Sequence, residues 1–233
     1  MTVAIDGPAG SGKSTIAHII ADELGLTFMN TGSFYRGVTL ALLRSRGLSA
    51  SETTGDAAGV PDEAARDVRG VLSDEEGITR FAAGVPLDYR AGRLFIGDED
   101  VERFLRSDAV ESVVAPLSGI VGVRHVVNAK IREIARNSNI VCEGRDMTTV
   151  VFPDAEYKFY LDASVSARAL RRFSQGTSSL TLAEIERAIE ARDEIDRNKK
   201  EGSLKISPDA VYIDTSDLTI REVCDMIISK IHL

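Results

Sequence analysis

Several features that define other classes of protein are missing from this sequence of 233 residues. It contains no run of about 18 or more consecutive apolar residues, so we expect no membrane-spanning helix. Its N-terminus has no basic stretch followed by an apolar run, and a predicted strand begins at Thr2, so we expect no secretory signal and a cytoplasmic protein. The two cysteines, Cys142 and Cys224, lie in apolar stretches and are expected to be buried thiols in a reduced compartment.

Metal-binding and basic residues are also scarce. The 3 histidines are scattered and no Cys/His spacing suggests zinc, so we expect neither a zinc site nor a catalytic histidine. With 28 Lys and Arg against 36 Asp and Glu, the formal net charge is −8, which argues against a broad surface for nucleic acid or membranes. We expect a small-molecule substrate and, by default, a monomer.

Within this basic fraction arginine dominates, since 21 of the 28 residues are Arg and 7 are Lys. A guanidinium group binds two phosphate oxygens at once, which an ammonium group does not. We expect most of these arginines to solvate helix faces, and a minority to form a local positive site for phosphate in an acidic protein.

Strand and helix patterns alternate along the chain. Short β-branched or apolar runs predict strands at 2–6 ("TVAID"), 26–30, 139–144 ("NIVCEG"), 155–163 and 209–216. Apolar residues at helical spacing predict helices at 13–25 and 33–47, two between 107 and 137 that break near Gly119 or Gly122, and two that follow the capping boxes Thr181–Glu184 and Thr219–Glu222. This alternation predicts a parallel sheet covered on both faces. Residues 49–102 differ, because the short runs "GITRFAAG" and "GRLFIGDEDV" suggest a small insertion that bears strands.

The most specific motif is "GPAGSGKST", which matches the P-loop pattern G-x-x-x-x-G-K-[ST] between a predicted strand and a predicted helix. Glycines let the backbone turn its N–H groups toward phosphate, and the following helix adds its positive end. Lys13 is placed to reach the β- and γ-phosphates, and Ser14 to hold Mg²⁺. We therefore predict an α/β P-loop three-layer fold in which ATP is bound by Gly7, Pro8, Ala9, Gly10, Ser11, Gly12, Lys13, Ser14 and Thr15.

The motif alone leaves the use of ATP open. A regulatory GTPase needs N-K-x-D to bind guanine, and the sequence lacks it. A motor or pump usually needs a longer chain and an apolar Walker-B strand that ends in a carboxylate, to which "NIVCEG" is a poor match. A small-molecule kinase fits the length better, and it needs a second site for an acceptor.

Three segments carry candidate acceptor residues. Thr31, Tyr35 and Arg36 follow the second strand, and Glu143, Arg145 and Asp146 follow a buried one, so both sets come to the sheet edge where open α/β sheets bind ligands. The first set is also explained as an ordinary helix cap. In "ARDEIDRNKK", Arg192 and Asp196 share a helix face, either as a surface ion pair or as part of a closing lid. Arg168, Arg171 and Arg172 precede "FSQGTSSLT", a polar loop suited to a hinge.

In this order and separation, "GPAGSGKST", "NTGSFYR", "GRDMTTVVFPDA" and "RDEIDRNKK" resemble the bacterial-type cytidylate kinases, over nearly the whole chain and least between 49 and 102. The resemblance implies transfer of the ATP γ-phosphoryl group to CMP or dCMP, with Mg²⁺. It implies that Thr31, Tyr35, Arg36 and Arg145 bind the acceptor phosphate and sugar, that Arg124 and Asp146 bind cytosine, and that Arg192 and Asp196 reach the sugar and phosphates. The expected catalytic residues are Lys13, Arg36, Arg145 and Arg192.

The resemblance also implies the domain division. We predict a core domain of residues 1–30, 107–165 and 205–233, a monophosphate-binding lobe of residues 31–106 that includes the insertion, and a lid of residues 166–204. Two positions depart from the family pattern: Ala115 stands where the family usually has a base-binding Ser, and Lys199 where the lid has an Arg. A broader pyrimidine monophosphate kinase, or an ATP-binding regulatory module without turnover, are the alternatives that the sequence leaves open.

Overall fold

The computed structural model describes residues 1–47, 72–136, 138–176 and 180–232, and it divides into two compact units. Unit 1 comprises Met1–Asn30 and Ser138–Leu233, and unit 2 comprises Thr31–Asn137. The division into core, lobe and lid predicted from the sequence stays a prediction.

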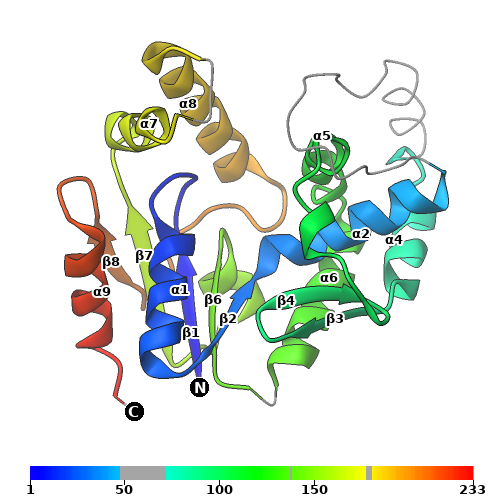
Figure 1. Ribbon diagram of the computed structural model, residues 1–233, viewed down its shortest axis with the longest axis horizontal. Coiled ribbons are helices and arrows are strands. Elements are labelled where there is room, and N and C mark those ends of the chain that lie inside the picture. Colours follow the sequence, from blue (N-terminus) through cyan, green and yellow to red (C-terminus); the bar gives the residue numbers. More distant parts are fainter. Residues whose placement is uncertain (48–71, 137, 177–179, 233) are drawn as a thin grey trace. The chain divides into compact units, whose positions relative to one another are not determined.

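Unit 1 contains a five-stranded parallel sheet in the order β2 (Thr27–Asn30), β6 (Ile140–Gly144), β1 (Thr2–Asp6), β7 (Tyr157–Asp162) and β8 (Val211–Asp214) (Figure 1). All five strands coincide with predicted ones, and the predicted α/β fold with a central parallel sheet flanked by helices is confirmed. Asp6 is in register with Gly144 in β6. The carboxyl ends of β1 and β6 therefore end together, at the edge where α/β proteins bind ligands.

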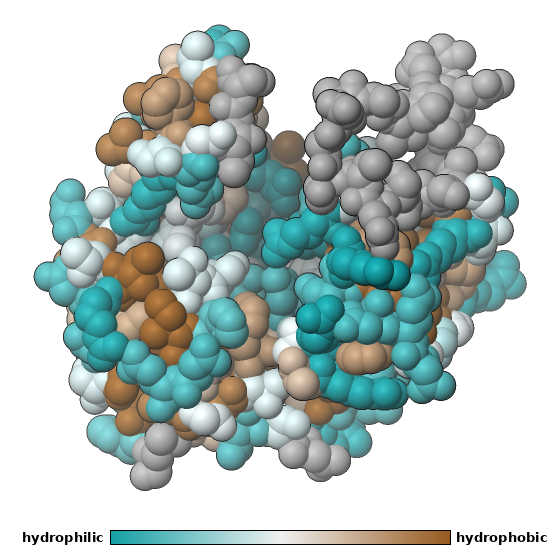
Figure 2. Space-filling view, viewed as in Figure 1, coloured by the Kyte–Doolittle hydropathy of each residue, from teal (hydrophilic) through white to brown (hydrophobic). Residues whose placement is uncertain are grey.

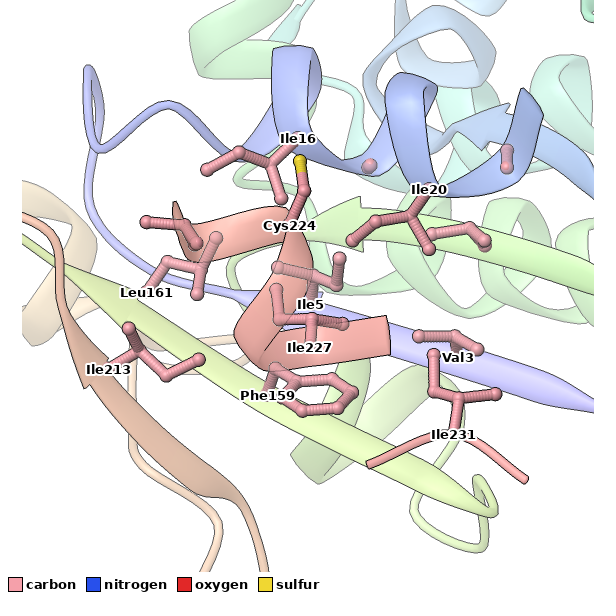
Figure 3. Close-up of a cluster of buried hydrophobic side chains, with 14 residues drawn as sticks. Val3, Ile5, Ile16, Ile20, Phe159, Leu161, Ile213, Cys224, Ile227 and Ile231 are labelled. Carbon is pink, nitrogen blue, oxygen red and sulfur yellow. The ribbon is translucent and has the colours of Figure 1, made fainter. Parts of the chain in front are cut away.

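Two helices, α1 (Lys13–Leu24) and α9 (Ile220–Ile228), cover one face of this sheet through a shared apolar core. Ile16 and Ile20 of α1 meet Cys224 and Ile227 of α9 above the aliphatic side chains of β1 and β7 (Figure 3). Each such side chain, when fully buried, contributes roughly 1.5–3 kcal/mol to folding. Cys142 and Cys224 are both free and buried, as predicted.

Helices α7 (Val165–Ser174) and α8 (Leu182–Asn198) form a hairpin beyond the carboxyl ends of the strands of unit 1 (Figure 1). The predicted capping box of Thr181 and Glu184 begins α8, and the second predicted box begins α9 at Thr219. The hairpin has a small core of its own, formed by Ala169, Ile185 and Ile189. Residues 177–179 of the predicted hinge loop lie outside the described residues.

The outer surface of this hairpin is partly apolar. Leu170 and Phe173 of α7 and Ile195 of α8 have exposed side chains, and Figure 2 shows hydrophobic surface over these two helices. Within unit 1, the apolar residues of the hairpin are thus divided between an inner core and an exposed side.

Unit 2 combines helices with a small antiparallel sheet. The helices are α2 (Thr31–Ser45), α4 (Glu75–Gly84), α5 (Asp108–Leu117) and α6 (Val121–Ala135), and the strands are β3 (Leu87–Arg90), β4 (Arg93–Ile96) and β5 (Glu99–Asp100), followed by a 3-10 turn at Glu102–Phe104. α2 packs against α5, and α4 packs against α6. The predicted break between the last two helices falls at residues 118–120, around Gly119.

The predicted strand-bearing insertion is partly wrong. "GRLFIGDEDV" does form β4 and β5, but "GITRFAAG" lies in α4. Asp74 caps this helix by accepting a hydrogen bond from the backbone N–H of Gly77 at 2.9 Å, and Ile78 and Ala82, four residues apart, are its buried residues. The alternation of apolar and polar residues in this segment suggested a strand. The Asp74 cap and the burial of one helix face favour a helix instead. Residues 49–71 of the insertion lie outside the described part of the chain.

Among the described residues, no single helix is long and apolar enough to cross a membrane. Helices α5 and α6 meet that test of length and composition only when taken together, as a pair bent by 106°.

Candidate functional site

The P-loop connects β1 to α1 and is shaped by glycines. Gly7, Gly10 and Gly12 have φ angles of 150°, 80° and 89°, a range that favours glycine. A Cβ atom at Gly7 would lie 2.0 Å from the carbonyl oxygen of Leu161 in β7, so no side chain fits there. The loop therefore passes close to the backbone of the neighbouring strand, and its curl depends on these residues.

Lys13 is the first residue of α1, and its side chain folds back into the loop. Its Nζ donates to the carbonyl oxygen of Pro8 at 2.6 Å and to Ser11 Oγ at 3.3 Å, and the residue is only 4% exposed. Burial, assisted by the positive charge of Arg145, lowers the pKa of Lys13 to about 7. The ε-amino group of Lys13 is therefore buried inside the loop.

Ser14 and Glu143 lie side by side at the head of α1. The hydroxyl of Ser14 donates to Oε1 of Glu143 at 3.0 Å, because β6 is the neighbour of β1 and Glu143 is in register with Ile5. Cys142 is buried in β6 as an apolar residue would be, and the carboxylate of Glu143 is on the residue before the last one of the strand.

This pair of oxygen donors fits Mg²⁺. Magnesium usually keeps several waters and binds one or two protein oxygens together with substrate phosphates, rather than a cage of side chains. The described residues contain no group of three or more His, Cys, Asp or Glu side chains that could hold a metal ion. The prediction that Ser14 holds Mg²⁺ extends to Glu143 as its neighbour.

Asp6, at the end of β1, anchors the segment that follows β6. Its carboxylate accepts hydrogen bonds from the backbone N–H groups of Met147 and Thr148 at 2.8 and 2.7 Å, and from Thr148 Oγ1 at 2.6 Å. These residues begin a π-helix at Met147–Val151, directly after Arg145 and Asp146. Burial raises the pKa of Asp6 to about 6, although the hydrogen bonds from Thr148 oppose the rise.

Sequence reasoning did not identify Asp6 as a site residue. The available signal was a carboxylate at the end of an apolar strand, immediately before Gly7. Its partners are separated from it by more than 140 residues, which no local pattern reveals.

Three cations meet at Asp196, whose side chain is 1% exposed. Arg145 Nε donates to Oδ2 at 2.9 Å, Lys199 Nζ lies 2.8 Å from Oδ1, and Arg192 Nε lies 3.5 Å from Oδ2. Burial favours protonation of this carboxylate, but Lys199 and Arg145 outweigh it and lower the pKa of Asp196. Arg145 therefore joins the loop after β6 to α8 through Asp196, whereas the predicted Arg192–Asp196 pair lies within α8, with the Arg192 side chain half exposed.

In unit 2, two of the predicted acceptor residues are in contact. The guanidinium carbon of Arg124 in α6 lies 5.6 Å from the centroid of the Tyr35 ring in α2, a cation–π arrangement. The hydroxyl of Tyr35 donates to Asn128 Oδ1 at 3.1 Å, and Arg124 Nη1 donates to the carbonyl oxygen of Ser118 at 3.3 Å. Asn128 is buried and was not predicted as a site residue.

The other two predicted residues of unit 2 lie in the same helix. Thr31 is the first residue of α2, as expected for a residue at a helix start. Arg36 donates from Nε to Glu111 Oε1 in α5 at 2.9 Å, so its guanidinium is oriented by a carboxylate. The predicted site residues thus form two sets: Lys13, Ser14, Arg145, Asp146, Arg192 and Asp196 in unit 1, and Thr31, Tyr35, Arg36 and Arg124 in unit 2.

A five-stranded parallel sheet with a glycine-rich loop and a buried lysine between its central strand and the first helix defines the class of P-loop nucleotide-binding proteins. The sequence matches the family described as cytidylate kinase over residues 3–233. This chain belongs to the cytidylate kinase family.

Relatives cover the full length of the chain. It is 39% identical over 235 aligned residues to a cytidylate kinase of Borrelia turicatae, covering 100% of this chain and 97% of the relative. It is 37% identical to a cytidylate kinase of Borrelia hermsii, covering 100% of this chain and 99% of the relative. A shikimate kinase from Bacteroides thetaiotaomicron superimposes with a TM-score of 0.44 at 10% identity, over 99% of this chain and 95% of its own.

Proposed function

We propose that the chain transfers the γ-phosphoryl group of ATP to CMP or dCMP, giving ADP and CDP or dCDP. The observation that carries the proposal is Lys13, which is buried within the P-loop with its Nζ 2.6 Å from the Pro8 carbonyl. Membership of the cytidylate kinase family supports the same reaction. A monomeric, cytoplasmic enzyme stays a prediction.

On the donor side, the backbone N–H groups of Gly7–Thr15 bind the phosphate chain, and Lys13 contacts the β- and γ-phosphates. Ser14 and Glu143 are the oxygen donors that would hold Mg²⁺. Bound there, the ion neutralises phosphate charge that otherwise opposes attack. Arg145, whose charge already acts on Lys13, adds to this positive potential at the end of β6.

On the acceptor side, arginines bind and orient a second anion. Arg36 and Arg145 bind the acceptor phosphate with Thr31 and Tyr35, and Arg124 and Asp146 bind the base. Arg192 and Asp196 reach the sugar and phosphates. The acceptor phosphate is itself a nucleophile, so the residues need to align two anions and cancel their repulsion, without a general base.

A coupled assay that detects ADP, with CMP, dCMP, UMP and AMP as acceptors, tests this function. We expect CMP and dCMP to be the best acceptors, and Lys13→Met to lower kcat about 100-fold or more because a positioned cation is lost. If CMP and dCMP are the poorest acceptors, the proposal is wrong. If the chain binds MgATP but no acceptor is phosphorylated, it is an ATP-binding module instead.

One observation favours a broader pyrimidine specificity as a second candidate. Ala115 in α5 has no hydroxyl, and the nearby Ser118 donates its hydroxyl to the Ala115 carbonyl at 2.9 Å. Ser118 is beside the proposed base-binding residue, since its carbonyl accepts from Arg124. A UMP/CMP kinase is therefore the alternative, and the UMP arm of the same assay distinguishes the two.

A further inference from the structure

Arg168 of α7 is a buried arginine with protein partners on all three of its nitrogens. Nε donates to the carbonyl oxygen of Ala163 at 2.9 Å, and Nη1 donates to the carbonyl oxygen of Ala9 in the P-loop at 3.0 Å. Nη1 and Nη2 also form a two-point ion pair with Asp193 of α8, at 3.1 and 2.6 Å. Arg168 is 2% exposed, so this guanidinium is committed to the protein and does not serve as a phosphate ligand.

The contact with Ala9 fixes the direction of a backbone N–H group that is placed to bind phosphate, that of Gly10. The carbonyl of Ala9 and the N–H of Gly10 belong to one trans peptide unit, so they point in opposite directions. When Arg168 holds the carbonyl on its own side, the N–H of Gly10 faces away from Arg168. The aliphatic part of Arg168 lies beside this peptide unit, since a Cβ atom added at Gly10 would lie 3.4 Å from Arg168 Cβ.

A second arginine of α7 braces the next part of the loop. Arg171 Nη1 donates to Thr215 Oγ1 at 3.2 Å, and its Nη2 also contacts the Thr215 carbonyl. Thr215 Oγ1 in turn lies 3.3 Å from the carbonyl oxygen of Ser11. Helix α7 therefore contacts the P-loop directly through Arg168, and indirectly through Arg171 and Thr215.

Asp193 makes this arrangement possible. A guanidinium this deeply buried needs a paired carboxylate, because an unpaired buried charge is costly. Asp193 supplies both oxygens and is itself 1% exposed. It lies one turn before Asp196 in α8, which has its own partner in Arg145 of the loop after β6.

We propose that Arg168 and Asp193 are positioning residues for the donor nucleotide, which act by orienting the Ala9–Gly10 peptide unit of the P-loop. This rests on the proposed function, in that the P-loop is taken to bind ATP. The consequence is selective: loss of the Arg168–Ala9 contact weakens binding of ATP, and leaves binding of the acceptor nearly unchanged.

The double variant Arg168→Met/Asp193→Leu separates positioning from stability. Replacing a buried ion pair by apolar side chains of similar volume is often neutral for stability, and Met retains the Cβ and Cγ atoms that lie beside Gly10. We expect a Tm close to that of the unaltered chain, a Kd for MgATP raised at least tenfold when measured without acceptor, and a KM for CMP within twofold. The matched control is Arg172→Met/Glu190→Leu, at exposed positions of the same two helices.

A second variant, Arg168→Lys, tests the inference in case the double variant does not fold. It keeps a cation opposite Asp193 but loses the planar fork that joins Ala9 and Asp193. We expect a Kd for MgATP raised at least fivefold with cooperative unfolding retained. Variants that fold and bind MgATP as tightly as the unaltered chain overturn the inference alone, and so does an equal rise in the KM for CMP. An unaltered chain that does not bind MgATP overturns the proposed function, and the inference with it.

Discussion

Ser14 Oγ and Glu143 Oε1 are 3.0 Å apart, although 129 positions separate them in the chain. The contact exists because β6 pairs with β1 and ends at the P-loop. A hydroxyl and a carboxylate in this position form the oxygen set that Mg²⁺ prefers.

Glu143→Gln is predicted to change the metal requirement of the enzyme. The amide keeps the size and one oxygen but loses the negative charge, so we expect kcat to fall about 10- to 100-fold and more Mg²⁺ to be needed for half-maximal rate. The measurement is a Mg²⁺ titration of the initial rate at saturating ATP and CMP. Glu190→Gln, at an exposed position of α8, serves as the control. An unchanged Mg²⁺ dependence in Glu143→Gln would exclude a role for this carboxylate at the metal.

Lys13 is predicted to take up a proton when the donor binds. Its pKa is about 7 in the free chain because it is buried, and the polyphosphate favours the charged form and raises that pKa. Binding at pH 8 should therefore take up close to one proton per MgATP, and binding at pH 6 almost none. The affinity should fall as the pH rises above about 7, by up to about tenfold per unit.

Calorimetry in two buffers with different ionisation enthalpies measures this uptake. Lys13→Met should abolish it, and Lys230→Met, at an exposed position of the C-terminal segment, should preserve it. No uptake by the unaltered chain at pH 8, or uptake that survives in Lys13→Met, would contradict the assignment of Lys13 as the cation that meets the phosphates.

Asp6→Asn is predicted to destabilise unit 1, and to do so more at low pH than at neutral pH. The amide cannot accept all three hydrogen bonds, which costs about 1–3 kcal/mol. The pKa of Asp6 is about 6 in the folded chain against 3.8 ordinarily, so the folded state binds more protons between these values. Ionisation of Asp6 therefore lowers the free energy of unfolding as the pH rises from about 4 to 6, by up to about 3 kcal/mol.

Asp6→Asn has no ionisable group at this position, so its free energy of unfolding does not show this decrease with rising pH. The difference in unfolding free energy between the unaltered chain and Asp6→Asn should thus be largest near pH 4 and should narrow by pH 7. Urea unfolding at four pH values in this range gives the curve. Two parallel curves would show that Asp6 ionises in the folded chain as it does in the unfolded one.

The sequence was informative wherever the signal is local. The β-branched run of β1, the glycines of the P-loop and the threonine–glutamate pairs that begin α8 and α9 each act over a few residues, and the structure has all of them in the predicted places. The prediction failed for "GITRFAAG", where the deciding contact comes from Asp74, three residues before the segment. Short apolar runs fit either period, and a cap just outside the run decides between them.

Polar contacts between residues far apart in the chain could not be predicted from the sequence, for a different reason. Asp6 contacts the π-helix because β1 and β6 are neighbours in the sheet. Arg168 contacts Asp193 and Ala9 because the α7–α8 hairpin brings these residues together. Arg168 falls within the predicted lid of residues 166–204, where an arginine is typical of a phosphate ligand. In the structure Arg168 is buried and bonded to protein groups, so it holds the P-loop and α8 instead. The residues next to Arg168 in the sequence indicate neither its burial nor its partners.

Ala115→Ser is predicted to sharpen the choice of base. The resemblance implies a base-binding serine where this chain has Ala115, and the hydroxyl proton of the nearby Ser118 is already donated to the Ala115 carbonyl. A serine at 115 restores a donor and acceptor near Arg124, so we expect the ratio of kcat/KM for CMP over UMP to rise about five- to tenfold, as one added hydrogen bond of about 1 kcal/mol allows. Ala115→Cys is the matched control, because it adds similar volume with a weak hydrogen-bonding group. Equal gains for serine and cysteine would mean that volume selects the base, and no gain for serine would place position 115 outside the base pocket.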